Sequence, residues 1–348
     1  MKFTKPDRLR KGDAIAVASH SWGGPSLFPH IYTRGIQNLE DFFSVKIKEY
    51  PTARMGADHL YKDPQGRARD INEAFADDEV RAIVASIGGD DSVRILPYLD
   101  IDTIKKNKKI CLGYSDSTTI LAYLNSLGLV TFHGPLIMAG FSQMDKFPVE
   151  FRTHIERMLF NPTATYMYKP YQQWSEGYPA WSKPENVGLI NDAHANEDGW
   201  HWLQGTDRVS GELFGGCVEV LEVMKSTDFW PNAEFWRGKI LFFETSSDYG
   251  AFPKQFKFDL RNYGMQGIFD KIAGLIIGRP RDYTPEQKDQ LDKFTVEVVG
   301  TEFGRKDLPI ISNMDFGHTD PQFILPLGIK AEIDCNNKVF SLLEAPVM

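Results

Sequence analysis

The sequence predicts an α/β fold in which a parallel β-sheet is covered by helices on both faces. Over the first 140 residues, short apolar runs alternate with helical patterns, an order typical of parallel sheets. Apolar periodicity returns near Arg208 and continues to the end of the chain. A chain of 348 residues is also long for one core and suits two domains of ordinary size.

The N-terminal part is expected to supply the strands of a parallel sheet. The expected strands cover residues 13–18, 45–49, 81–87, 109–113 and 130–132. The expected helices cover residues 31–43, 66–75 (with a possible continuation toward Val80), 92–99 and 117–127. Polar or glycine-containing turns follow several of the strands, and binding sites in α/β proteins gather at such strand ends.

A change of composition separates this part from the rest of the chain. Between residues 145 and 205 prolines recur, apolar periodicity weakens, and four tryptophans appear at positions 174, 181, 200 and 202. Long irregular segments in compact proteins are often functional. The alternative is a connector whose aromatic side chains pack on their own domain. The expected domains are therefore 1–160, a linker with an aromatic loop over 161–205, and 206–348.

The C-terminal part is expected to form a second α/β unit. The expected strands cover residues 239–243, 273–278 and 309–312, followed by a closing hairpin of 330–333 and 338–343. The expected helices cover residues 217–224, 256–264 and 287–299.

Composition excludes several function classes. Lys plus Arg is 39 and Asp plus Glu is 47, which gives a net charge of −8, and no long basic run is present. A nucleic-acid partner is therefore not expected, because phosphate binding needs concentrated Lys and Arg. Cys111, Cys217 and Cys335 are scattered, so neither a disulfide framework nor a zinc site is expected.

The location of the protein is also an expectation from the sequence. The N-terminus lacks the apolar core of a signal peptide, and no stretch reaches the roughly 20 apolar residues of a membrane span. A cytoplasmic protein without a membrane partner is expected.

The turn after the strand at 109–113 holds a candidate nucleophile. The strand runs into Tyr114-Ser115-Asp116-Ser117 and then into a helix. Such a strand-to-helix turn can expose a serine hydroxyl at the edge of the sheet. The amide of Asp116 lies in the first turn and is free to stabilise an oxyanion. The match to G-x-S-x-G is incomplete, and the alternative is that Ser115 or Ser117 only caps the helix.

A nucleophilic serine needs a base, and the base needs an acid that orients it. His318 follows a predicted strand directly, while His133 and His20 have similar settings. The other histidines lie in helices, loops or the variable segment. Glu244 ends the strand at 239–243, where a carboxylate is costly to bury unless it is paired. An exposed glutamate at a strand end is the alternative.

A double glycine follows the strand at 81–87. Gly88 and Gly89 allow close approach of the backbone to a bound group, and Gly89 is the better candidate for a second oxyanion amide. A tight turn between strand and helix explains the pair equally well. The segment is no Walker motif, and no G-x-G-x-x-G follows the first strand.

In this order, the segments resemble the LD-carboxypeptidase family of serine peptidases along nearly the whole chain. The stretches that carry the resemblance are Lys5-Pro6 with Leu9 and Gly12 to Ile15, Asp70 to Phe75 with Ile83 to Gly89, Arg94 to Asp100, Gly113 to Asp116, Thr131 to Pro135, Gly215-Gly216, Glu244, and Gly317-His318. Each motif is short, but the ordered set is specific.

The resemblance implies both a fold and a mechanism. It implies a Rossmann-like N-terminal domain, a smaller C-terminal α/β domain, a site between them and a homodimer. It implies Ser115 as nucleophile, His318 as general base and acid, and Glu244 as its orienter, with oxyanion amides from Asp116 and Gly89. No metal or organic cofactor is expected.

The family has two kinds of member, one trimming D-alanine from murein tetrapeptides and one resembling the microcin C immunity peptidase. The second kind cuts between an aminoacyl group and a nucleotide-like moiety. Chain length, the Asp90-Asp91-Ser92 run after the double glycine, and the aromatic segment 170–203 favour it. The substrate-binding candidates are Gly88, Asp90 and Trp181, with Trp181 expected to stack on a base. A catalytically inactive ligand-binding protein is the alternative from another class.

Overall fold

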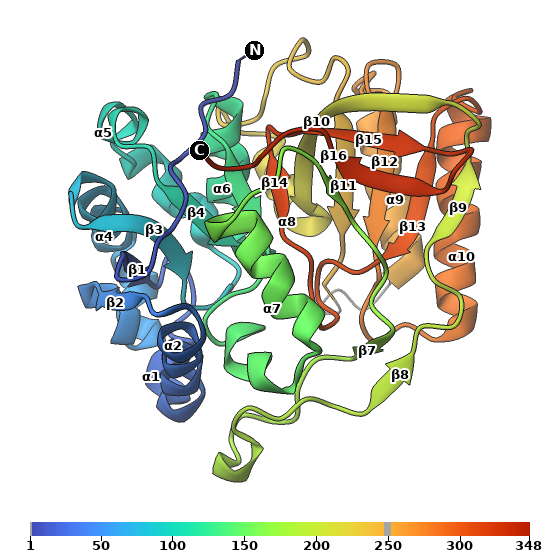
Figure 1. Ribbon diagram of the computed structural model, residues 1–348. Helices are drawn as coiled ribbons and strands as arrows, with labels where there is room; N and C mark the ends of the chain where they lie inside the picture. The colour runs from blue at the N-terminus through green and yellow to red at the C-terminus, as the bar shows by residue number, and fades with distance from the viewer. Residues whose placement is uncertain (1, 247–251) are drawn as a thin grey trace.

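The computed structural model describes residues 2–246 and 252–348, and it confirms the α/β class (Figure 1). Among these residues, two large sheets form the two halves of the molecule. The first has the strand order β14-β5-β4-β3-β1-β2, and the second has the order β6-β16-β15-β10-β11-β12-β13-β9. Both contain a run of parallel strands, so loops that follow neighbouring strands meet at one edge of each sheet.

The first sheet is built mainly by the N-terminal part of the chain. Its parallel strands are β1 (Ala14–Ala18), β2 (Lys46–Glu49), β3 (Val80–Ala85), β4 (Ile110–Gly113) and β5 (Thr131–His133). These strands agree with the sequence prediction within two residues at nearly every end. A sixth strand, β14 (Leu325–Leu327), comes from the C-terminal part and pairs antiparallel with β5.

This half contains four short helices that the sequence analysis did not predict (α1, α3, α5 and α7), and two of the predicted helices differ from expectation. The helices of this half are α1 (Gly24–Leu27), α2 (Pro29–Phe43), α3 (Ala57–Lys62), α4 (Pro64–Ala76), α5 (Ile101–Lys106), α6 (Thr118–Ser126) and α7 (Val149–Ile155). Helix α4 starts earlier than expected because the Asp63 side chain caps it by accepting from the Gly66 amide, and it does not reach Val80. The helix expected at 92–99 is a 3₁₀-helix, Ser92–Tyr98, which contains Pro97.

The segment predicted as a linker contributes strands as well as a loop. Strand β6 (Tyr166–Met167) pairs with β16, and β9 (His201–Gln204) pairs with β13, so both add to the second sheet. Strands β7 (Gln173–Ser175) and β8 (Ala193–Ala195) form a hairpin around a long loop (Figure 1).

The second sheet holds the remaining strands. They are β10 (Arg208–Cys217), β11 (Ile240–Glu244), β12 (Gly274–Gly278), β13 (Ile310–Met314), β15 (Lys330–Asp334) and β16 (Val339–Leu342). Strands β10 to β13 run parallel, and β15 with β16 forms the predicted closing hairpin. The helices of this half are α8 (Val218–Met224), α9 (Phe252–Met265) and α10 (Pro285–Val296), which continues as a π-helix to Glu302.

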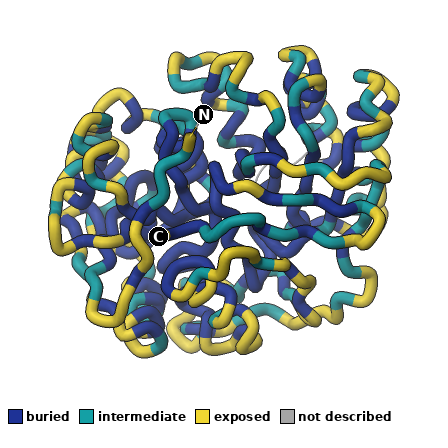
Figure 2. The backbone as a smooth tube through the Cα atoms, turned by 45° about the horizontal axis from the view of Figure 1, so that its top comes forward, coloured by how far each residue is buried: buried dark blue, intermediate teal, exposed yellow. Residues whose placement is uncertain are grey.

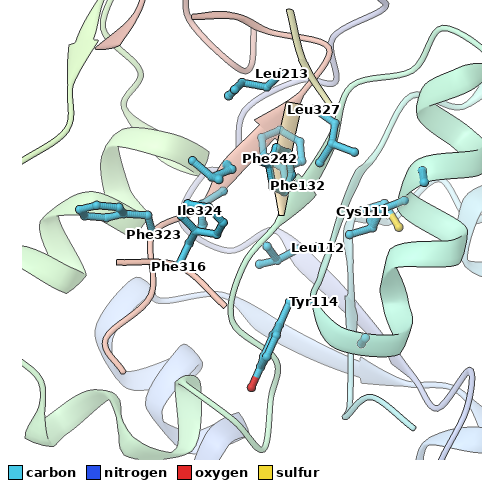
Figure 3. Packing of buried hydrophobic residues seen from close by; sticks show 14 of the residues in the cluster. Cys111, Leu112, Tyr114, Phe132, Leu213, Phe242, Phe316, Phe323, Ile324 and Leu327 are labelled. Atoms are coloured by element: carbon cyan, nitrogen blue, oxygen red, sulfur yellow. The ribbon is translucent and has the colours of Figure 1, made fainter. Parts of the chain in front are cut away.

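A continuous apolar core joins the two halves. Buried residues lie along the strands of both sheets in the centre of the molecule, and exposed residues lie at the periphery (Figure 2). Where the sheets meet, Phe132 of β5, Phe242 of β11 and Leu327 of β14 lie in one cluster (Figure 3). The chain ends lie side by side, since the Arg8 and Met348 backbones are hydrogen bonded. Among the described residues, no helix is long and apolar enough to cross a membrane.

Candidate active site

The turn between β4 and α6 presents Ser115 in a strained conformation. Ser115 has a φ of 57°, in the left-handed region that residues with side chains rarely adopt. It is partly exposed, while Tyr114 and Asp116 on either side are buried. Ser117 stands at the N-cap of α6 but makes no side-chain cap hydrogen bond, because its hydroxyl contacts His20 Nε2 at 3.0 Å. Helix capping therefore accounts for neither serine.

Glu244 and His318 are brought together from two neighbouring strand ends. Glu244 is the last residue of β11 and His318 follows β13, and His318 Nδ1 lies 2.5 Å from Glu244 Oε2. Gly317 permits this contact, since it has a φ of 98° and a Cβ on it would lie 2.6 Å from Glu244 Cβ.

The carboxylate of Glu244 is ionised despite its burial. Burial by itself would raise the pKa of this carboxyl, but the adjacent His318 ring and its hydrogen bond outweigh that effect and hold the pKa below its ordinary value. Such a carboxylate keeps the Nδ1–H tautomer of the imidazole and leaves Nε2 free to accept a proton.

His318 packs against the residue that precedes the strained serine. The rings of His318 and Tyr114, the residue before Ser115, are in edge contact with centroids 5.0 Å apart. Within the described residues the Ser115 hydroxyl makes no hydrogen bond to His318. Hydrogen bonds of this kind are often long in an enzyme without substrate and shorten when the substrate binds.

The double glycine lies against the turn that carries the serine. A Cβ built on Gly88 would lie 3.0 Å from Ser115 Oγ and 3.5 Å from the Asp116 nitrogen, so the double glycine lies directly against the turn. Neither the Gly89 amide nor the Asp116 amide donates to another described residue. An oxyanion requires free N–H groups of this kind close to the nucleophile, and the Asp116 amide directly follows Ser115 in the chain.

A buried ion pair fixes the loop that carries the double glycine. The Arg67 guanidinium, which is 0% exposed, donates from both terminal nitrogens to Asp91 at 2.6 and 3.0 Å. Ser21 Oγ accepts from the Asp90 and Asp91 amides at 3.2 and 3.4 Å. Sequence reasoning did not single out Arg67 or Ser21, because both are distant in the chain and neither follows a recognisable motif.

The two remaining predicted residues, Asp90 and Trp181, have different surroundings. Asp90 is exposed, and its side chain makes no hydrogen bond or ion pair with a described residue. Trp181 stacks on Tyr178 with ring centroids 4.6 Å apart and contacts Phe28 edge-on at 5.8 Å. The indole N–H of Trp181 is buried and has no partner among the described residues.

The loop is tied to both sides of the candidate site. On one side, the backbones of Ser175 and Asp320 exchange hydrogen bonds of 2.8 and 3.1 Å, two residues beyond His318. On the other side, Trp22 contacts Phe28, and the Trp22 amide donates to Gly88 O at 3.1 Å. The aromatic loop therefore spans from the His318 turn to the double glycine.

The other two candidate histidines have different surroundings. Burial, followed by the nearby Arg67 charge, lowers the pKa of His20 to about 4. His133 lies at the end of β5, fully buried, and its Nε2 faces Glu244 Oε1 at 3.9 Å. Within the described ranges, no three His, Cys, Asp or Glu side chains are grouped so that they could hold a metal ion.

Comparison with known proteins identifies the family of the chain. The N-terminal domain model of the LD-carboxypeptidase family matches residues 15–134, and the C-terminal domain model matches residues 210–333. The microcin C7 self-immunity protein MccF of Escherichia coli is 29% identical over 97% of this chain and 94% of its own length. A probable murein peptide carboxypeptidase of Bacillus subtilis is 26% identical over 99% of this chain and 95% of its own length.

Solved structures lead to the same family. A crystal structure of an MccF-like protein from Streptococcus pneumoniae in complex with AMP is 30% identical, with a TM-score of 0.84, over 95% of this chain and 98% of that one. An MccF-like protein from Bacillus anthracis is 26% identical, with a TM-score of 0.83, over 97% of this chain and 99% of that one. The chain belongs to the LD-carboxypeptidase family of serine peptidases.

Proposed function

We propose that Ser115, His318 and Glu244 form a catalytic triad that hydrolyses an amide bond of a small substrate. The observation that carries the proposal is the 2.5 Å contact between the His318 ring and the ionised Glu244, next to a serine held at a φ of 57°. An oriented imidazole close to a partly exposed, strained serine is the arrangement that activates a serine nucleophile.

The steps follow from these positions. His318 Nε2 takes the hydroxyl proton as Ser115 Oγ attacks the carbonyl carbon, and Glu244 stabilises the imidazolium that results. The amides of Gly89 and Asp116 hold the oxyanion of the tetrahedral intermediate. His318 then gives the proton to the leaving nitrogen, the C–N bond breaks, and an acyl-serine ester remains. Water, deprotonated by His318, cleaves the ester and restores Ser115.

An aminoacyl-nucleotide is the substrate class that the residues around the serine favour. One relative is a microcin C7 self-immunity protein, and a similar structure was determined in complex with AMP. The stacked rings of Tyr178 and Trp181 and the buried indole N–H offer a π surface and a donor for a nucleobase. Gly88 and Asp90 border the reacting end of the substrate.

A murein tetrapeptide is the second candidate substrate. The 26% identity to a probable murein peptide carboxypeptidase supports it, because the triad positions serve both substrates equally. In that case the aromatic loop only packs on the domain surface. A ligand-binding protein without activity is the third candidate, and it predicts no turnover of either substrate.

Assembly and location belong to the same proposal. The family resemblance supports a cytoplasmic homodimer that acts on a small molecule. Sedimentation at several protein concentrations tests the dimer.

The first experiment compares two substrates by mass spectrometry. A muramyl tetrapeptide ending in D-alanine and an aminoacyl-sulfamoyl adenosine are incubated with the wild type, Ser115→Ala and the matched control Ser117→Ala. We expect cleavage of the nucleotide compound, its loss in Ser115→Ala by several orders of magnitude, and substantial activity in Ser117→Ala. Near-normal turnover by Ser115→Ala would rule out the triad.

Trp181→Ala separates the two substrate classes. We expect KM for the nucleotide compound to rise about 5- to 150-fold, since stacking on a base is worth about 1–3 kcal/mol. Release of D-alanine alone, with no effect of Trp181→Ala, would instead make the protein a murein carboxypeptidase.

A further inference from the structure

His133 is a buried histidine whose polar atoms have no partner. It ends β5 with 1% of its surface exposed, and neither ring nitrogen makes a hydrogen bond with a described residue. In native structures, the large majority of buried polar atoms have a hydrogen-bond partner. An unpaired imidazole close to the candidate active site therefore calls for an explanation.

The group facing His133 is the second oxygen of Glu244. Glu244 Oε2 is held by His318, while Glu244 Oε1 is buried and has no partner among the described residues. His133 Nε2 lies 3.9 Å from this oxygen, about 1 Å beyond the usual N–H···O distance. Two unpaired buried groups of complementary character therefore face each other across a gap that a small side-chain shift closes.

Aromatic rings hold His133 in this position. Its ring contacts Phe242 with centroids 5.3 Å apart, Tyr114 at 6.1 Å and Phe316 at 6.5 Å. Figure 3 shows these three rings in the cluster where the sheets meet, with the Tyr114 hydroxyl pointing away from it. The apolar surroundings lower the pKa of His133 to about 4, so the imidazole is neutral and has a single N–H to donate.

We propose that His133 is a positioning residue that donates its Nε2–H to Glu244 Oε1 and thereby holds Glu244 Oε2 on His318. The proposal rests on the assignment of Glu244 and His318 to the triad. A carboxylate bound through both oxygens cannot rotate away from the imidazole, and its ionised form is stabilised at low dielectric. Without the donor, Glu244 accepts a proton more readily, and His318 loses its orientation at a higher pH.

The titratable groups around this pair enter the pH argument. His318, Cys217, Glu219 and Tyr114 interact electrostatically with Glu244, and Asp320 interacts electrostatically with His318. None of them is altered by substitution at position 133, so a change in the pH profile between position-133 variants reports on the donor itself.

Three variants of His133 either keep a hydrogen-bond donor at the position of one ring nitrogen or remove the donor. In His133→Gln the amide nitrogen takes the place of Nε2, in His133→Asn it takes the place of Nδ1, and in His133→Phe no donor remains. We expect kcat to fall about 10- to 100-fold in the Asn and Phe variants, the effect of one hydrogen bond to a charged group. The Gln variant retains most of the wild-type kcat, and KM stays unchanged in all three.

The pH profile and thermal unfolding separate positioning from packing. The acidic limb of kcat/KM moves to higher pH in the Asn and Phe variants and stays in place in the Gln variant. If activity instead follows the unfolding temperature, or if Asn and Gln behave alike, His133 only fills space and the proposal is wrong.

A measurement without substrate keeps this test independent of the proposed function. An NMR titration of the His318 imidazole in the wild type, His133→Gln and His133→Phe measures the effect of residue 133 on His318 through Glu244. Only in the Phe variant is the midpoint of the His318 titration expected to change. A wild type that cleaves neither substrate but shows this shift overturns the proposed function alone, while an active wild type without the shift overturns only the role of His133.

Discussion

Glu244 is the residue whose chemistry depends most on its neighbours. Glu244→Gln keeps the size of the side chain but removes the charge that stabilises the imidazolium in the proposed mechanism. We expect kcat to fall by up to about 10⁴-fold, because the His318 tautomer and charge are no longer supported. Steady-state kinetics with the substrate that proves active measures this loss, and Glu222→Gln on the neighbouring helix α8 is the matched control.

The pH dependence of the wild type follows from the same residue. The pKa of Glu244 is held below its ordinary value by His318, so the carboxylate remains charged as pH falls through the weakly acidic range. The stabilisation from this contact is present above the ordinary glutamate pKa and is lost only as pH falls through the depressed one. A Glu244→Gln variant that retained the full rate would contradict the role of the charge.

At the scale of single residues, the sequence predicts which residues are candidates for catalysis but not which of them are in contact. Ser115, Glu244 and His318 can be found because each ends or follows an apolar strand. The pairing of Glu244 with His318 across 74 positions depends on the order of β11, β12 and β13 in the sheet, which no local pattern reveals. The unpaired nitrogens of His133 are visible only once the packing around them is known.

At the scale of elements, the buried pair of Arg67 and Asp91 joins α4 to the loop with the double glycine. Asp91→Asn leaves the Arg67 guanidinium buried without a counter-charge. We expect the free energy of unfolding to fall by about 3 kcal/mol, the lower end of the range for a broken buried pair. Urea unfolding measures it, with Asp90→Asn as the exposed neighbour that changes stability by less than about 0.5 kcal/mol.

The sign of the pH effect follows from the shift at Asp91. Burial opposes ionisation, but the hydrogen bonds and charges of Arg67 and Arg94 prevail and lower the pKa of Asp91. The contribution of the pair is therefore complete above the ordinary aspartate pKa and declines as pH falls through the depressed one. The stability difference between wild type and Asp91→Asn should shrink in acid. If Asp91→Asn and Asp90→Asn have the same free energy of unfolding at neutral pH, the pair of Arg67 and Asp91 does not stabilise the fold.

Elements with a clear period were predicted well, and elements set by tertiary contacts were not. The parallel strands of the first sheet are short apolar runs and match their predicted positions. Strand β10 escaped prediction because Gly211, Gly215 and Gly216 interrupt its apolar pattern. These glycines are explained by close approach of the neighbouring backbone, since a Cβ on Gly211 would lie 1.9 Å from Gly238 O.

At the scale of the whole molecule, the two halves are interleaved. The boundaries at residues 160 and 206 stay a prediction, but β14 of the C-terminal part forms the edge of the first sheet beside β5. No sequence pattern indicates this exchange, because a strand of three residues carries no period. Its consequence is that the first sheet is completed only after the last part of the chain has folded.

Interleaving predicts that the halves unfold together. Leu327 on β14 is 0% exposed and packs where the sheets meet, so Leu327→Ala should lower the free energy of unfolding by about 2–5 kcal/mol. Leu27, which is 55% exposed, offers the matched control, and Leu27→Ala should cost far less. Tryptophan fluorescence and far-UV circular dichroism should give coincident urea transitions in all three proteins. If the wild type itself instead unfolds in two separate transitions, β14 does not join the halves, and the separation near residues 160 and 206 defines independently folding domains.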